Sequence, residues 1–458
     1  MIRSARRLSH AIRSPSAPQE ESGAGGDADA GLEAYRPGVD GPWTRDEASH
    51  LARRMVFGAP SDLVARILSQ TPSEAAAEIL AEKPENEDIR FTSDISRQVA
   101  GLDGAQASWI YRMLRGSNPA REKLALFWHG HFATSERKVD NVRLMLRQVD
   151  LFRTKGAGAF EELLAAVARD PAMLIWLDGN SNRKGNPNEN FARELFELFA
   201  LGIGHYTEVD IKEAARAFTG WHVKADEFWF NERAHDAEPK RVLGREGTLD
   251  GGDVIRICVE EPASAEFIAS KLYEFYVHPA PTKALRTALG KAFSAASRRT
   301  GEFLVRLLSS RAFFSARSRR ALVTTPADFA VGSLATLGAR ANAGAVARSM
   351  AAMGQELLAP PSVKGWEMGE AWLNSTTLLA RYRFAVSAAG VEGDKAEQDL
   401  GARWDGGSQL TDPVAEILAR FFPERLSPDV EKALRSSASG DARLLAAGCL
   451  QLPEHQFF

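Results

Sequence analysis

The sequence has few cysteines and no long apolar run, and these absences exclude several classes of protein. Its 458 residues include two cysteines, Cys258 and Cys449, so disulfide bonds cannot be the main support of a fold this large. No apolar stretch approaches the ~20 residues that a membrane-spanning helix needs. A formal net charge of -3 gives no electrostatic reason to expect nucleic acid as a partner. Stability must therefore come from an apolar core, for which 44% hydrophobic residues suffice.

The motifs of several common chemistries are also absent. The chain has no P-loop, no Gly-x-Gly-x-x-Gly, no Cys-x-x-Cys and no Gly-x-Ser-x-Gly. We therefore expect no nucleotide cofactor, no zinc ribbon and no α/β-hydrolase site. Arg3, Arg6 and Arg7 near the start are not followed by an apolar segment, so we expect no secretory signal peptide and a cytoplasmic location.

Composition and helical periodicity predict a mainly α fold, a multi-helix globular array. Thr44 and Glu47 form a capping box at the start of the first helix, and apolar residues recur at helical spacing along most of the chain. Around 226–258, Phe228 and Phe230 alternate with polar residues, and Val254, Ile255 and Ile257 are β-branched. This stretch predicts a small β-ribbon insertion.

Changes in composition divide the chain into four parts. Residues 1–41 are rich in small, polar and acidic residues and predict a disordered tail. Residues 42–389 form the main helical domain, and the polar, Gly-containing residues 390–409 a linker. Residues 410–458 predict a C-terminal helical subdomain that packs on the main domain.

Two histidines, His129 and His131, flank Gly130 in a strongly aromatic run. Imidazoles one residue apart share a side where the backbone is extended or turned, since in a helix they diverge by about 200°. Glycine commonly ends helices, so we expect a turn at Gly130 and a pair of rings able to chelate one metal ion. The competing interpretation is that both rings cap a helix C-terminus, where the dipole favours positive charge.

A second cluster lies on the helix that follows an Asn-rich loop. Glu189, Arg193, Glu194 and Glu197 share one polar arc, opposite an arc of Phe and Leu residues. The arc can be an exposed ladder of ion pairs, worth a few tenths of a kcal/mol for each pair. Alternatively it faces an internal cleft, where Glu194 and Glu197 would offer two carboxylates to a metal ion or a substrate.

A third cluster, His235-Asp236 with Lys240 close behind, follows the expected ribbon. A His-Asp pair in a loop is weak evidence for a site by itself. It gains weight if the fold brings it to the first two clusters.

Long motifs in this chain resemble a bacterial family catalogued as domain of unknown function 1800. The motifs span 126–135, 170–178, 188–195, 219–221, 360–366 and 372–381. The resemblance runs from about residue 45 to the end and implies a helical protein without an established activity. It also implies a partner: members often accompany a second uncharacterised family that is similar to sulfatases. Many members are exported, so export in association with such a partner is the alternative to a cytoplasmic location.

The family motifs draw attention to a loop bounded by Pro and Gly. Lys364, Trp366, Trp372 and Asn374 lie in it, and aromatic residues with a lysine and an amide are typical of loops that line ligand sites. The competing interpretation is that the two tryptophans fill the core.

The leading hypothesis from these patterns is a metal-assisted, hydrolase-like enzyme with its site in a helical cleft. A divalent metal ion of unspecified identity would be bound by His129, His131, Glu194 and Glu197.

The catalytic groups of that enzyme would be Glu194, His235 and Asp236, either completing the shell or acting as a base. Arg193 would orient carboxylates or an anionic substrate. Two alternatives use the same residues: a non-catalytic binding or assembly protein that acts with a sulfatase-like partner, and a non-haem iron redox enzyme. The sequence does not specify an oligomeric state.

Overall fold

The computed structural model describes residues 31–99, 101–391, 400–405, 412–424 and 426–458, with the backbone alone at 96–99. Most of the expected tail and parts of the expected linker lie outside these residues. Residues 31–41, expected in the tail, are packed: Leu32 and Tyr35 are buried, and the Tyr35 amide donates to the Ser309 carbonyl at 2.8 Å. The ordered fold therefore starts before Trp43.

Helices dominate the first part of the chain. They are α1 Arg45–Met55, α2 Ser61–Leu68, α3 Pro72–Leu80, α4 Glu87–Val99, α5 Leu102–Arg115, α6 Pro119–His131, α7 Glu136–Val139, α8 Val142–Lys155, α9 Phe160–Ala168 and α10 Pro171–Trp176. The capping box predicted at α1 is confirmed. The Thr44 side chain accepts from a backbone amide of the first turn, and the Glu47 carboxylate accepts from the Thr44 amide. Asn118 and Pro119 open α6, with proline where no amide hydrogen is needed.

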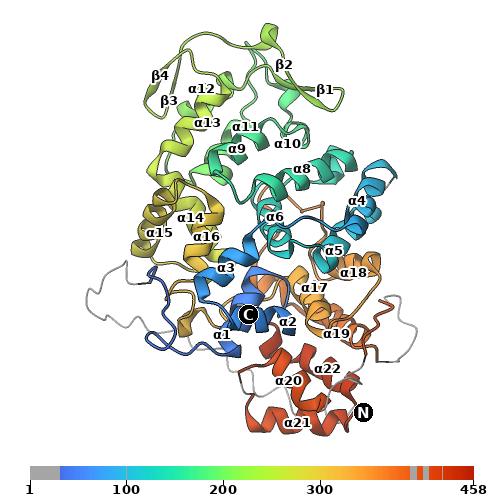
Figure 1. Cartoon of the computed structure of the whole chain (residues 1–458). Helices are drawn as coiled ribbons and strands as arrows, with labels where there is room; N and C mark the ends of the chain where they lie inside the picture. The colour runs from blue at the N-terminus through green and yellow to red at the C-terminus, as the bar shows by residue number, and fades with distance from the viewer. Residues whose placement is uncertain (1–30, 100, 392–399, 406–411, 425) are drawn as a thin grey trace.

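The middle of the chain mixes helices with two hairpins. The elements are α11 Asn190–Glu194, a π-helical segment Leu195–Ala200, α12 Glu208–Ala217, β1 Trp221–Lys224, β2 Glu227–Phe230, β3 Lys240–Val242, β4 Arg245–Gly247 and α13 Gly251–Glu260. The strands pair antiparallel as β1–β2 and β3–β4, and Figure 1 places both hairpins at one end of the molecule. The predicted small β insertion is thus confirmed.

The expected strand at 254–257 is wrong, because this stretch belongs to helix α13. Asp250 caps the helix in a capping box with Asp253. Val254, Ile255 and Cys258 then fall on one helical face and are fully buried, where α13 packs against α9 and α12. The cap and the helical spacing outweigh the strand preference of the β-branched residues, which is weak and context-dependent.

The rest of the described chain is helical. It contains α14 Pro262–Tyr276, α15 Lys283–Ala295, α16 Thr300–Leu308, α17 Pro326–Leu337, α18 Ala343–Ala352, α19 Ser375–Ala388, α20 Pro413–Phe421, α21 Pro428–Ala438 and α22 Ala442–Gln451. Helices α20 to α22 lie at the end opposite the hairpins (Figure 1). Helix α22 packs against α19, and one continuous apolar core includes side chains from both. No helix in the described part of the chain is long and apolar enough to cross a membrane.

Helix α6 lies near the middle of this arrangement (Figure 1) and packs against α3, α5 and α8. Trp128 is fully buried in it, and its indole N–H donates to the Gly156 carbonyl at 3.0 Å. Gly156 has to be glycine, because an added Cβ would lie 2.6 Å from the Trp128 ring. This tight core fixes the direction in which every other side chain of α6 points.

Candidate functional site

The two histidines of the aromatic run point away from each other. Helix α6 continues through Gly130 to His131, so the turn expected at Gly130 does not form. Helical geometry then directs the two rings to nearly opposite sides. His129 packs among Trp109 and Trp366, whereas the Nε2–H of His131 donates to the Phe199 carbonyl at 3.0 Å.

A cavity of about 490 Å³ opens beside His131. Its walls come from α6, the π-helical segment, α14 and the segment 355–368. Its lining includes Leu126, Phe127, Gly130, His131, Glu197, Leu198, Phe267, Lys271, Glu274, Phe275, Gln355, Lys364 and Trp366. The site thus combines aromatic walls with a few polar groups, which is the usual make-up of a small-molecule site.

The π-helical segment shapes one wall of this cavity. The sequence predicts one continuous helix from Asn190 to about Leu201, but from Leu195 the turns are wider. The segment ends at Ala200, which leaves the Phe199 carbonyl available to His131, and Glu197 lines the cavity. Single π-helical turns inside helices occur frequently at functional sites.

Gly202 ends the π-helical segment in a left-handed conformation with φ of 82°. An added Cβ would lie 2.9 Å from the Phe267 ring, so glycine meets both the backbone and the packing requirement here. The contact holds the π-helical segment against α14.

The charges around the cavity are incompletely matched. Burial lowers the pKa of His131 to about 4, so its ring is neutral, and Nδ1 is left as an acceptor without a partner among the described residues. Lys271 lies 3.5 Å from Glu274. No ion pair or side-chain hydrogen bond of Lys364 is found among the described residues, although its charge acts on Glu194.

Glu194 and Glu197 lie close enough to influence each other. Burial, and then the charge of Glu197, raise the pKa of Glu194, while Arg193 and Lys364 act against this. Of the two carboxylates, Glu197 lines the cavity and Glu194 does not.

His129 lies behind the cavity wall and is fully buried. Neither ring nitrogen has a hydrogen-bond partner among the described residues, and burial lowers the pKa of the ring to about 3. A neutral imidazole carries one N–H, which is therefore left unsatisfied here. Trp366 contacts this ring and also lines the cavity, so it separates His129 from the open space.

The other residues predicted from the sequence lie outside the cavity lining. Arg193 binds Glu189 and Glu208 at 2.8 to 3.0 Å and is half exposed. His235 donates to the Thr219 carbonyl at 2.8 Å, and Asp236 accepts from Arg216 at 2.8 Å, which lowers the pKa of Asp236.

The loop that carries the two predicted tryptophans is divided by the fold. Lys364 and Trp366 line the cavity. Trp372 is buried elsewhere, with its carbonyl accepting from the Thr377 hydroxyl at 2.9 Å, and Asn374 caps α19. The ligand-lining interpretation therefore fits Lys364 and Trp366, and the core-filling interpretation fits Trp372.

The donor set for a metal ion is not assembled in the described part of the chain. No group of three or more His, Cys, Asp or Glu side chains lies where one ion could be held. His131 and Glu197 line the same cavity, but His129 faces another direction and Glu194 lies outside the lining.

Several cavity residues escaped the sequence prediction. Phe267, Lys271 and Glu274 recur at helical spacing on α14, and Gln355 follows α18. In the sequence, the spacing of Phe267, Lys271 and Glu274 indicates only an ordinary amphipathic helix. Its role depends on which helix faces it, and local spacing does not carry that information.

A model of a protein family matches residues 50–457, and its description is "Protein of unknown function (DUF1800)". The chain belongs to the DUF1800 family. No curated protein and no solved structure matches this DUF1800 chain. The family membership predicted from the motifs is thus confirmed, and the cavity is the feature from which a function has to be inferred.

Proposed function

We propose that this DUF1800 protein binds a small organic molecule with an apolar body in the cavity beside His131. The observation that carries the proposal is the cavity itself, about 490 Å³ and walled by Phe127, Phe267, Phe275 and Trp366. Pockets of about 300–1,000 Å³ with apolar walls commonly hold small ligands. Burial of the ligand's apolar surface would supply most of the affinity.

The polar groups of the cavity would orient this ligand. His131 offers a neutral acceptor at Nδ1, Glu197 a carboxylate, and Lys364 an ammonium group without an ion-pair partner in the described chain. A few groups placed in an apolar wall give orientation because the ligand's own polar atoms must find partners when they leave water.

The test is a screen of small aromatic and aliphatic compounds by thermal unfolding, repeated with a variant that fills the cavity. Leu198→Trp places a large ring in the lining, and Leu378→Trp makes the same change on the exposed face of α19. Ligands that bind the native state raise its unfolding temperature. We expect hits to stabilise the wild type and Leu378→Trp but not Leu198→Trp. Equal stabilisation of all three proteins would refute the proposal.

A second candidate is a hydrolase-like enzyme that acts on the bound molecule by proton transfer. It is supported by the pair of Glu194 and Glu197: Glu197 lines the cavity, and burial together with the Glu197 charge raises the pKa of Glu194, the direction that favours a general acid. Glu194→Gln and Glu197→Gln would then abolish turnover of a ligand from the screen while binding persists. Loss of binding and turnover together in Glu197→Gln would instead assign that residue to recognition.

Metal-assisted and non-haem iron versions of this enzyme are tested separately. Elemental analysis of freshly purified protein, its absorbance spectrum, and its unfolding temperature with added Zn²⁺, Mn²⁺ or Fe²⁺ are the measurements. A stoichiometric metal that is lost in His131→Ala would favour these versions. A metal-free protein with an unchanged unfolding temperature would count against them.

A non-catalytic role beside a sulfatase-like partner rests on the family resemblance and stays a prediction. Co-purification of the two proteins from cells that express both is its test. In that case Leu198→Trp would leave the complex intact.

A further inference from the structure

A second cavity of about 300 Å³ adjoins the first. The two share part of their lining, namely Gly202, Ile203, Phe267, Lys271 and Glu274. The two cavities therefore lie side by side, with these residues at their common boundary.

One face of helix α14 forms the floor of both cavities. Phe267, Lys271 and Glu274 line the two together, while Phe275 lines the first and Ser270 the second. These positions recur three and four residues apart, so they lie on one side of the helix. Helix α15 contributes Arg286 to the second cavity, where it packs along α14.

The second cavity contains one buried donor without an acceptor and two cations that share a carboxylate, Glu274. Ser270 is 5% exposed, and its buried hydroxyl has no hydrogen-bond partner among the described residues. Lys271 and Arg286 approach Glu274 at 3.5 and 3.7 Å, which is an ion pair but not a close hydrogen bond. A buried hydroxyl without an acceptor, in a cavity that two cations also line, is a place where an acceptor is missing.

We infer that the ligand spans both cavities, with an apolar body in the first and a single carboxylate in the second. This inference rests on the proposed binding function and specifies the class of ligand. A carboxylate accepts hydrogen bonds at both oxygens, so it can serve Ser270, Lys271 and Arg286 together. Glu266 and Glu274 also line the second cavity, and their charges oppose a dianionic head such as a phosphate monoester.

The first experiment compares four probes of equal chain length on the full chain by calorimetry: octanoate, octanol, octylamine and octyl phosphate. We expect octanoate to bind about tenfold tighter than any of the others, the gain typical of a charge-assisted hydrogen bond. Equal binding of the four, or a preference for the amine or the phosphate, overturns the inference. If none of the four binds while compounds from the screen still do, the carboxylate assignment fails and the proposed function stands. If nothing binds in either experiment, both fail.

The second experiment compares two matched variants on α15. Arg286→Gln removes a cation from the second cavity, and Lys283→Gln makes the same charge change at an exposed position of α15 outside both linings. Arg286→Gln should weaken octanoate about tenfold and leave octanol unchanged, while Lys283→Gln leaves both unchanged. An equal effect of the two variants would mean a long-range charge effect and would overturn the inference.

Ser270→Ala is the sharper of these variants, because the hydroxyl has no protein partner to lose. We expect an unchanged unfolding temperature and a fewfold weaker affinity for octanoate. Unchanged affinity would remove Ser270 from the site and overturn the proposed placement of the head group.

Discussion

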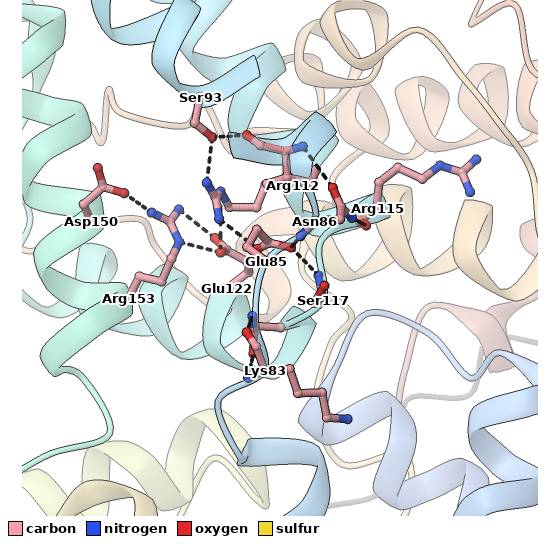
Figure 2. Close-up of polar contacts among 12 residues, drawn as sticks. Lys83, Glu85, Asn86, Ser93, Arg112, Arg115, Ser117, Glu122, Asp150 and Arg153 are labelled. Atoms are coloured by element: carbon pink, nitrogen blue, oxygen red, sulfur yellow. Dashed lines mark hydrogen bonds and ion pairs between the residues drawn. The ribbon is translucent and has the colours of Figure 1, made fainter. Parts of the chain in front are cut away.

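Two polar regions near helix α6 differ in how completely their charges are matched. On one side, Glu122 is fully buried and is bound by Arg153 at 2.5 and 2.9 Å and by the Trp109 indole at 2.9 Å. Arg112 adds a contact to Glu122 and bonds Glu85 and Ser93, as Figure 2 shows. On the other side, the cavity leaves Lys364 and His131 Nδ1 without protein partners in the described chain.

The contrast separates structural from functional polarity. A buried charge is tolerated when every lone pair and proton has a partner, as at Glu122, and such a network needs nothing from outside. At the cavity, Lys364 and His131 Nδ1 have no such partners in the described chain, so they remain available to a ligand. We therefore take the network in Figure 2 as support for the fold and the cavity as the site.

The largest expected effect comes from breaking the matched region. Glu122→Ala removes two hydrogen bonds of Arg153, which keeps its contact with Asp150, and leaves the Trp109 N–H buried without its acceptor, so we expect a loss of about 3–5 kcal/mol in the free energy of unfolding. Urea denaturation measures it. The control is Glu208→Ala, which breaks the exposed ion pair with Arg193 and should change little. Similar losses in both would mean that Glu122 is not the centre of a buried network.

Asp170 tests what a buried carboxyl does when it has hydrogen bonds but no ion pair. It accepts from Gln148 at 2.7 Å and from the Met173 amide at 3.1 Å, and burial raises its pKa to about 6. The folded pKa lies above the ordinary value of 3.8. The contribution of Asp170 to the free energy of unfolding is therefore fully present below pH 3.8 and is lost as pH rises through 6.

The measurement is the free energy of unfolding of Asp170→Asn relative to wild type at pH 4.5 and 7.5. Asparagine does not titrate, so the variant should gain relative to wild type as pH rises, by about 2–3 kcal/mol in total. A difference that does not change with pH would show that Asp170 titrates near its ordinary value.

His129 is the unmatched residue on the inner side of the cavity wall. Its pKa of about 3 in the folded protein lies below the ordinary 6.5, so its contribution is present above pH 6.5 and is lost as pH falls through 3. His129→Leu removes the unsatisfied ring nitrogens, and we expect a stability at pH 7 equal to or above wild type. Relative to wild type the variant should gain about 1.4 kcal/mol per pH unit below 6.5. A large loss at pH 7 would indicate a partner for the ring.

The smallest effect is expected at Gly130, between the two histidines. An added Cβ would meet the Trp366 ring at 3.9–4.0 Å, an ordinary contact. Gly130→Ala should therefore stabilise the protein by about 0.5–1 kcal/mol in urea denaturation, because alanine restricts the unfolded chain. The control Gly156→Ala should destabilise, since its Cβ would collide with Trp128.

Local patterns predicted local structure well and the site in part. The cap at Thr44 was readable because it depends on a few adjacent residues, whereas Asn374, predicted to line a ligand site, instead caps α19. His131, Glu197, Lys364 and Trp366 were singled out and do line one cavity. The prediction of a turn at Gly130 was wrong. Helix α6 continues to His131, because the packing around Trp128 holds the helical conformation through the glycine.

The sequence by itself determined the family, the helical class and the start of α1, because caps and apolar spacing act over one or two turns. The tertiary structure alone decided that the rings of His129 and His131 point to nearly opposite sides of α6. It also brought α14 and Lys364 to one cavity and left His235 and Asp236 outside its lining. Which side chains meet is fixed by how helices distant along the chain pack, and only the folded core settles those directions.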